Sequence, residues 1–425
     1  MERKKVIKKI IFSLAKTFFL LFTQKVSAQF LQDLKAPQVA QDRVLNSILF
    51  NLNRSQYGKK IGKVESYDEY RTKAPIIEYD DIEQPIVRMM EGESDVLLPG
   101  EVKLFEKTSG SSSKAKFIPY SKEVLKDFTT MFQIWVQNLL TKGPKLDTGT
   151  FYFSVSPQFS GTRKKGKAQV NLEDDRDYLK GLTRIALSPF MAVSPKIKSL
   201  TDPEEYQDFL LRSLLTTKGL EVLSFWNPSF FTTLLRRLQN SPPEGIPYTN
   251  EQIQKAFANE DLTPLFPNIK MISCWGSALA QSEFQLLEKW FPRAYVQKKG
   301  LLATEGPITI PFLDREEYFT PLLNLVFLEF IDAETHEIKR LHEIEMNKEY
   351  EIILSTRGGL YRYRLGDRII VTSTFYSTPC FDFLGRKNQT SDLVGEKLTE
   401  SYCEAFFRRQ AEENFSFLLP SLENK

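Results

Sequence analysis

Apolar positions along the chain recur at two different spacings. After Ser121, a suitable N-cap, they fall three or four residues apart, which predicts a helix. These positions are Val124, Phe128, Met131, Trp135 and Leu139. Four short runs, 151–155, 269–275, 325–330 and 352–355, are instead rich in aromatic and β-branched residues and predict strands. Helices and strands that alternate in this way predict an α/β fold with a mixed, largely buried sheet.

The later part of the chain shows a turn followed by an alternating pattern. Residues 357–359, Arg-Gly-Gly, predict the turn. Two tyrosines then alternate with two arginines over 361–364, which predicts a half-exposed strand. The pattern changes again at Gly385-Arg386. The residues that follow, to the end of the chain, are mostly polar and predict helix.

The first 35 residues form a segment of their own. Residues 1–9 are basic and residues 10–22 are mostly apolar, although Lys16 interrupts the apolar run. That run is too short to span a bilayer, so we expect an amphipathic helix and no stable membrane insertion. The alternative is a signal peptide, since Val26-Ser27-Ala28 loosely resembles a cleavage site.

Composition narrows the classes of function. The chain has 425 residues, of which 57 are basic and 54 acidic, so the net charge of +3 favours a neutral small-molecule enzyme over a nucleic-acid or anionic-lipid binder. Two histidines and three cysteines, none spaced as C-x-x-C, do not build an ordinary zinc site. They also disfavour a Ser-His or Cys-His hydrolase. We expect the three cysteines to be reduced and to have no special role, which is typical of a cytoplasmic protein.

A loop rich in small hydroxylated residues occupies positions 108–116, with the sequence TSGSSSKAK. Backbone N–H groups and hydroxyls around a glycine can converge on phosphate oxygens, and a lysine adds positive charge. The stretch does not align with a Walker loop. A serine-rich surface turn is the alternative interpretation.

Two further stretches contain residues whose chemistry suits a nucleotide. Residues 302–306 read LATEG, and residues 363–367 read YRLGD. A carboxylate such as Asp367 suits two ribose hydroxyl donors at once, and a glutamate such as Glu305 suits a cation that neutralises phosphate charge. Each stretch alone is also typical of an ordinary turn.

Together the three stretches resemble the nucleotide motifs of the adenylate-forming superfamily. The resemblance implies that Lys116, Thr304 and Glu305 are catalytic, with Glu305 holding Mg²⁺ and Thr304 contacting the α-phosphate of ATP. It also implies a set of nucleotide contacts. These are Thr108, Ser109, Gly110, Ser111, Ser112, Gly276, Ser277, Ala303, Tyr363, Asp367 and Arg386. Ser113 and Lys114 depart from the motif, because they stand where the superfamily usually has glycine.

Within that superfamily the chain resembles the auxin-responsive-promoter acyl acid-amido synthetases and their bacterial relatives. The narrower resemblance is carried by Phe117-Ile118-Pro119, by 383–388 (FLGRKN) and by 391–397 (SDLVGEK). It implies that ATP and a small carboxylic acid give an acyl-adenylate, which an amino acid then converts to an amide. An acyl-CoA ligase, which passes the acyl group to a thiol, is the alternative within the enzyme class.

The resemblance also implies a domain organisation. We expect an N-terminal amphipathic helix over 1–35 and a large adenylate-forming domain over 36–384, with several subdomains of mixed β-sheet flanked by helices. Residues 385–425 would form a hinge and the stub of a truncated C-terminal domain, because about forty residues are too few for the whole of it. A catalytically impaired nucleotide-binding remnant is therefore an alternative from a different class.

Overall fold

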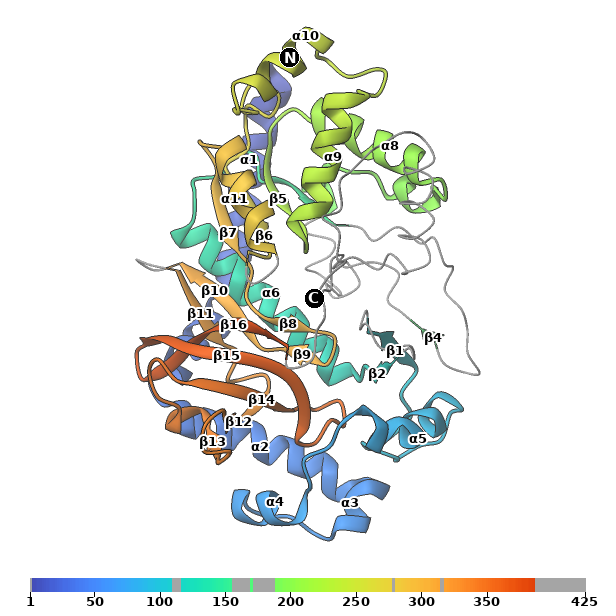
Figure 1. The fold of residues 1–425 in the computed structure, drawn as a ribbon, viewed down its shortest axis with the longest axis vertical. Helices are drawn as coiled ribbons and strands as arrows, with labels where there is room; N and C mark the ends of the chain where they lie inside the picture. The colour runs from blue at the N-terminus through green and yellow to red at the C-terminus, as the bar shows by residue number, and fades with distance from the viewer. Residues whose placement is uncertain are drawn as a thin grey trace, which may run out of the picture.

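Two large β-sheets organise the chain, one above and one below a long central helix (Figure 1). The computed structural model describes residues 2–108, 116–154, 169–170, 188–276, 280–313 and 317–386. The helices are α1 Glu2–Asp33, α2 Pro37–Arg54, α3 Gln56–Ile61, α4 Tyr67–Lys73, α5 Tyr79–Met90, α6 Lys122–Lys142, α8 Pro203–Thr216, α9 Pro228–Asn240, α10 Asn250–Ala258 and α11 Gln281–Trp290. No helix among the described residues has the length and apolar character needed to cross a bilayer. The fold is thus mixed α/β, with its sheets flanked by helices, as the sequence predicts.

The upper sheet is parallel and covered on both faces. Its order is β3-β5-β6-β7, with β3 Thr150–Phe153, β5 Leu220–Ser224, β6 Met271–Cys274 and β7 Tyr295–Lys298. Neighbouring residues on these strands point to opposite faces. Val222 and Met271 pack with Trp135 of α6, whereas Leu223 and Ile272 pack among α8 to α11. Burial on both faces explains why the strands read as continuous apolar runs.

The lower sheet is antiparallel, with the order β13-β12-β14-β15-β16. Its strands are β12 Phe327–Asp332, β13 Ile338–Arg340, β14 Glu349–Ser355, β15 Tyr363–Phe375 and β16 Thr378–Arg386. A separate hairpin of β10 Thr309–Leu313 and β11 Glu317–Pro321 lies between this sheet and α6 (Figure 1). Strands β3, β6, β12 and β14 fall on the four predicted runs, and Val155 lies outside the described residues.

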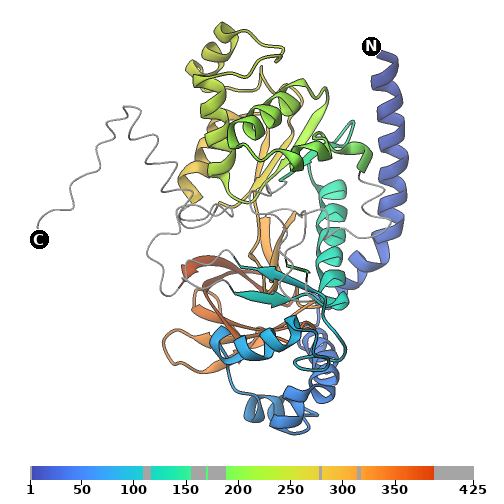
Figure 2. The ribbon, with the colours of Figure 1, turned by 90° about the vertical axis from the view of Figure 1, so that its right-hand side faces the viewer.

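Helix α6 confirms the helix predicted from residue 121. The Ser121 side chain accepts a hydrogen bond from the backbone N–H of Val124 and so caps the first turn. The apolar positions on α6 are buried: its first half packs in the lower core and its second half against the upper sheet. Figure 2 shows α6 upright in the middle of the molecule, with α1 beside it along the outer edge.

The prediction of a half-exposed strand over 361–364 is wrong at its start. Strand β15 begins at Tyr363, and Arg362 has a positive φ of 52° and only 3% of its surface exposed. Its Nε donates to Glu329 at 2.9 Å, and its Nη1 donates to the carbonyls of Arg71 and Ala74. The local pattern does not reveal a buried carboxylate on another strand, so the arginine reads as exposed.

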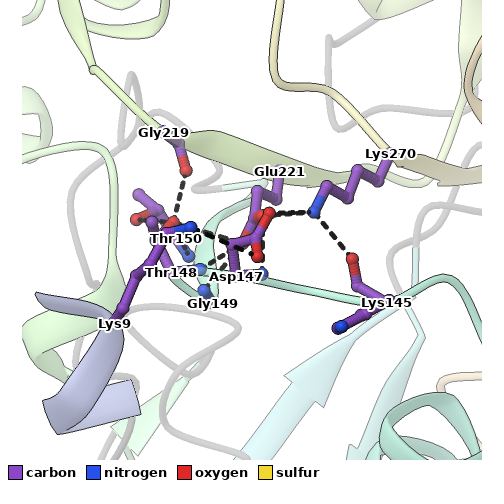
Figure 3. A network of polar contacts seen from close by, with 9 residues as sticks. All are labelled: Lys9, Lys145, Asp147, Thr148, Gly149, Thr150, Gly219, Glu221 and Lys270. Carbon is purple, nitrogen blue, oxygen red and sulfur yellow. Dashed lines mark hydrogen bonds and ion pairs between the residues drawn. The ribbon is translucent and has the colours of Figure 1, made fainter. Parts of the chain in front are cut away.

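A buried carboxylate ties the loop before β3 to the upper sheet (Figure 3). Glu221 on β5 accepts hydrogen bonds from the backbone N–H groups of residues 147–149, each at 2.8 Å. Lys270 completes the arrangement, with its Nζ 2.9 Å from Glu221 and 2.7 Å from the Asp147 carboxylate. Lys9 of α1 pairs with Asp147 at 3.5 Å. Charge-assisted bonds therefore fix this loop against both β5 and the N-terminal helix.

A second long-range ion pair joins α6 to the turn at 357–359 and makes stability depend on pH. Arg357 donates to Asp127 at 2.6 Å. Burial raises the pKa of Asp127 to about 7, and the charge of Arg357 only partly opposes this shift. The folded protein therefore binds a proton on Asp127 that the unfolded chain has already lost, between pH about 4 and about 7. The bound proton therefore stabilises the folded protein. This contribution to the free energy of unfolding is complete below pH about 4 and is lost as the pH rises through about 7.

We expect the free energy of unfolding of the wild type to fall by about 2 to 4 kcal/mol more between pH 4 and pH 8 than that of Asp127→Asn, which cannot titrate. Urea unfolding at the two pH values measures this difference. Asp147→Asn is the control, because ion pairing with Lys270 lowers the pKa of Asp147 and keeps it outside the window. An equal pH dependence in wild type and Asp127→Asn would contradict the prediction.

Candidate nucleotide-binding site

A short hairpin presents both ends of the predicted phosphate loop. Strands β1 Leu104–Lys107 and β2 Phe117–Pro119 are antiparallel, with Lys107 opposite Phe117. The backbone N–H of Thr108 donates to the carbonyl of Lys116 at 3.0 Å, so these two residues face each other. Residues 109–115 connect them and lie outside the described residues, which leaves Ser109, Gly110, Ser111 and Ser112 unplaced.

Tyr79 at the start of α5 holds the lysine end of this hairpin. Its hydroxyl accepts a hydrogen bond from the backbone N–H of Phe117 at 2.8 Å. The ammonium group of Lys116 lies 5.6 Å from the centre of the Tyr79 ring, within the range of a cation–π contact. Burial raises the pKa of Tyr79, so the phenol stays neutral. The arrangement fixes the position of Lys116 and leaves the residue half-buried.

The acidic turn lies next to the hairpin. Strands β8 Leu302–Ala303 and β9 Gly306–Pro307 pair antiparallel, and Thr304 and Glu305 form the turn between them. Tyr120, which directly follows β2, donates from its hydroxyl to the carbonyl of Thr304 at 2.8 Å. The two bonded residues are 184 positions apart in sequence, so this bond connects the hairpin to a distant motif. Glu305 is nearly buried, with 8% of its surface exposed.

The YRLGD stretch opens β15 on the same side of the molecule. Tyr363 pairs with Leu354 of β14 and bridges to Ile77, which precedes the Tyr79 anchor by two residues. Gly366 has a φ of 80°, a conformation that glycine adopts readily. Asp367 follows, 1% exposed, with its backbone opposite Arg386 at the end of β16. Tyr363 is therefore joined to the hairpin through the segment that leads into α5.

The fourth element is the end of β6. A Cβ at Gly276 would lie 2.7 Å from the side chains of Lys298 and Phe284, so the position has room for glycine alone. The Trp275 ring packs against Phe383 of β16 with 5.8 Å between ring centres. This contact connects the end of the parallel sheet to the strand that carries Arg386. Ser277 lies outside the described residues.

These contacts bring the candidate residues that the structure describes into one region between the two large sheets. Figure 1 shows β1, β2, β8 and β9 at middle height, below the ends of β5 and β6 and at about the level of β15. Tyr79 and Tyr120 link the hairpin to β15 and to the acidic turn, and Trp275 links β6 to β16. The carboxyl ends of parallel strands are a common place for ligands to bind.

Lys299 belongs to none of the predicted motifs but lies at the same edge of the parallel sheet. Its Nζ donates to Ser224 at 2.7 Å and lies 5.0 Å and 5.6 Å from the rings of Trp226 and Trp135. A cation set among aromatic rings can contact an anionic, partly apolar ligand. The signal in the sequence is a pair of lysines, Lys298 and Lys299, of which the first ends β7 and the second follows it.

The cysteines and possible metal ligands among the described residues bear on two other kinds of chemistry. Burial raises the pKa of Cys274 to about 12 and that of Cys380 to about 11, so both are protonated thiols and poor nucleophiles. Among these residues no three His, Cys, Asp or Glu side chains are placed to hold a metal ion. A magnesium ion that arrives with a nucleotide takes only one or two protein carboxylates. Glu305 fits that lesser requirement.

Comparisons with known proteins match most of the chain to one family. Residues 26–247 match the GH3 family N-terminal domain, and residues 319–386 match the GH3 family central domain. Indole-3-acetic acid-amido synthetase GH3.3 of Arabidopsis thaliana is 23% identical over 432 residues, covering 89% of this chain and 71% of that protein. The 4-substituted benzoates-glutamate ligase GH3.12 of the same plant is 21% identical, covering 85% of this chain and 71% of that protein.

Solved structures show the same fold. The AtGH3.15 acyl acid amido synthetase in complex with 2,4-DB superposes with a TM-score of 0.73 at 20% identity, over 87% of this chain and 72% of that one. The family match covers more than half of the chain and includes α2 to α6, the β1-β2 hairpin and β3. The central-domain match covers the lower sheet, in which β15 and β16 carry Asp367 and Arg386. The chain is therefore a member of the GH3 family.

Proposed function

We propose that this chain activates a small carboxylic acid with ATP and transfers the acyl group to an amino acid. The observation that carries the proposal is the bond from Tyr120 to Thr304, which connects the ends of the phosphate loop to the acidic turn. Relatives in the same family are named as amido synthetases or ligases. In the first step a carboxylate oxygen attacks the α-phosphorus and pyrophosphate leaves. In the second step an amine attacks the acyl carbon and AMP leaves.

The phosphate loop would bind the triphosphate. Backbone N–H groups and hydroxyls of the loop would donate to phosphate oxygens, and Lys116 would add a positive charge that Tyr79 keeps in place. The proposed loop contacts are Thr108, Ser109, Gly110, Ser111 and Ser112. Donors fixed before the reaction stabilise the charge that develops on phosphorus without reorganising during the step.

The acidic turn would act at the α-phosphate. We assign Thr304 as a hydroxyl donor to an α-phosphate oxygen and Glu305 as a ligand of the cation that the nucleotide carries. That cation, Mg²⁺, would neutralise phosphate charge when bound. The backbone of Ala303 at the end of β8 would line the same side.

The remaining nucleotide contacts would come from both sheets. Gly276 and Ser277 would border the adenine, and Tyr363 and Arg386 would flank the nucleotide from the lower sheet. Asp367 would accept hydrogen bonds from the ribose hydroxyls, although its 1% exposure means that the groups that cover it must first move aside. We place the reaction in the cytoplasm, where ATP is available and unpaired thiols such as Cys274 stay reduced.

Pyrophosphate release by the purified chain tests the proposal. With ATP, Mg²⁺ and a panel of aryl and alkyl carboxylic acids, we expect release that depends on the acid, and an amide product when amino acids are added. Mass spectrometry identifies the product. A thioester formed with coenzyme A, and no amide, would replace the amido synthetase with an acyl-CoA ligase. Saturable ATP binding without any release would show a nucleotide-binding module that lacks turnover.

A further inference from the structure

Eight large apolar side chains lie exposed along one side of α1. They are Val6, Ile7, Ile10, Ile11, Leu14, Phe18, Leu21 and Phe22, and their exposed fractions run from 49% to 68%. Their spacing of three and four residues places them on one face of the helix, about 24 Å long. Only six other large apolar side chains are exposed in the part of the chain that the structure describes, and three of these are less exposed than any of the eight. An apolar face of this extent indicates a surface that another molecule covers.

The opposite face of α1 is held against the protein. Phe12, Phe19 and Phe30 are buried, and the Thr23 hydroxyl donates to the side-chain oxygen of Gln137 on α6. Phe12 packs so closely on Gly149 that a Cβ there would lie 2.1 Å from its ring. Figure 2 shows α1 along the outer edge of the molecule, with α6 on its inner side only. The helix is thus docked by its inner face, and this contact leaves the outer face open.

The charge of α1 indicates what covers that face. The helix contains seven of the 57 basic residues and two of the 54 acidic ones, Glu2 and Asp33 at its ends. It therefore carries a net charge of +5, and the rest of the chain carries −2. The near-zero balance of the whole chain conceals this local excess. Lys9 is paired with Asp147, whereas Lys25 is exposed on the outer side.

We propose that the outer face of α1 docks on the surface of an anionic membrane, with the helix lying in the interface. Interfacial helices combine an apolar face with flanking lysines, and anionic lipids attract basic segments within a Debye length. A second copy of the chain is a poorer partner, because it would bring another +5 helix against the first. The helix lies on the membrane and does not cross it.

Flotation of the full chain with lipid vesicles tests this proposal. We expect binding to phosphatidylcholine vesicles that contain about 30% phosphatidylglycerol, and binding roughly tenfold weaker to pure phosphatidylcholine. Raising the salt from about 0.1 M to about 0.5 M should weaken binding to the anionic vesicles. The triple variant Leu14→Gln, Phe18→Gln, Leu21→Gln should lose roughly tenfold or more in vesicle binding. Its melting temperature should match that of wild type, because these side chains are exposed.

A matched triple variant controls for surface hydrophobicity in general. Val39→Gln, Phe50→Gln and Met346→Gln remove exposed apolar side chains elsewhere and should leave vesicle binding unchanged. Absence of wild-type binding, equal binding to neutral vesicles, or undiminished binding of the α1 triple variant would overturn the proposal. A different outcome would assign the face to a second copy of the chain: the wild type forms a dimer in light scattering and does not bind vesicles, and the α1 triple variant is a monomer. None of these readouts depends on the proposed catalytic activity.

Discussion

Replacing Arg362 with alanine is expected to lower the free energy of unfolding by about 3 to 5 kcal/mol, which urea unfolding can measure. The guanidinium is 3% exposed and pairs with Glu329, which is fully buried. Alanine would leave that carboxylate in the core without its ion-pair partner, and among the described residues the Tyr67 hydroxyl, at 3.1 Å, would be its remaining side-chain donor. Burial, together with the charge of Glu329, raises the pKa of Tyr67, so this donor is neutral.

Two further variants separate a buried charge from a lost contact. Arg368→Ala removes an arginine whose ion pair with Glu349 is largely exposed, and should cost no more than about 1 kcal/mol. The double variant Arg362→Met with Glu329→Leu removes both charges and should regain stability relative to Arg362→Ala. A loss below about 1 kcal/mol in Arg362→Ala would contradict the burial of this pair.

Glu305→Gln is expected to reduce acid-dependent pyrophosphate release by about 100-fold or more, if the proposed function holds. Glutamine keeps the size of the side chain but lacks the charge that would bind the cation. Initial rates at several Mg²⁺ concentrations measure the effect, and a higher concentration should restore part of the rate. Unfolding curves should stay close to those of wild type, which separates a lost ligand from a lost fold.

A turn carboxylate away from the site provides the comparison for Glu305. Glu334 lies exposed between β12 and β13, and Glu334→Gln should release pyrophosphate at the wild-type rate. A Glu305→Gln variant with the wild-type rate and the same dependence on Mg²⁺ would remove Glu305 from the mechanism. Loss of activity in both variants would point to a general effect of charge on the assay.

The elements that sequence predicts best are those set by local periodicity. Helix α6 follows from the cap at Ser121 and its apolar spacing, and four strands follow from short aromatic and β-branched runs. In each case the spacing and type of residues that predict the element lie within one turn of helix or a few residues of strand.

What sequence does not predict are polar contacts between distant residues. Arg362 reads as an exposed strand residue because its carboxylate partner is 33 residues away, and Asp127 meets an arginine 230 residues away. Glu221 gives no sign that three backbone N–H groups converge on it from a loop more than 70 residues earlier. Lys299 belongs to no motif, so only the fold shows that it lies beside Trp226.

Helix α6 belongs to two hydrophobic cores at once. Its residues Val124 and Phe128 pack in the core of the lower sheet, and Trp135 and Leu139 pack against the parallel sheet. Neither sheet can separate from α6 without exposing apolar surface on a helix that the other sheet also uses. Because both cores depend on packing against α6, loss of one destabilises the other. We therefore expect the two halves of the molecule to unfold together in a single cooperative transition.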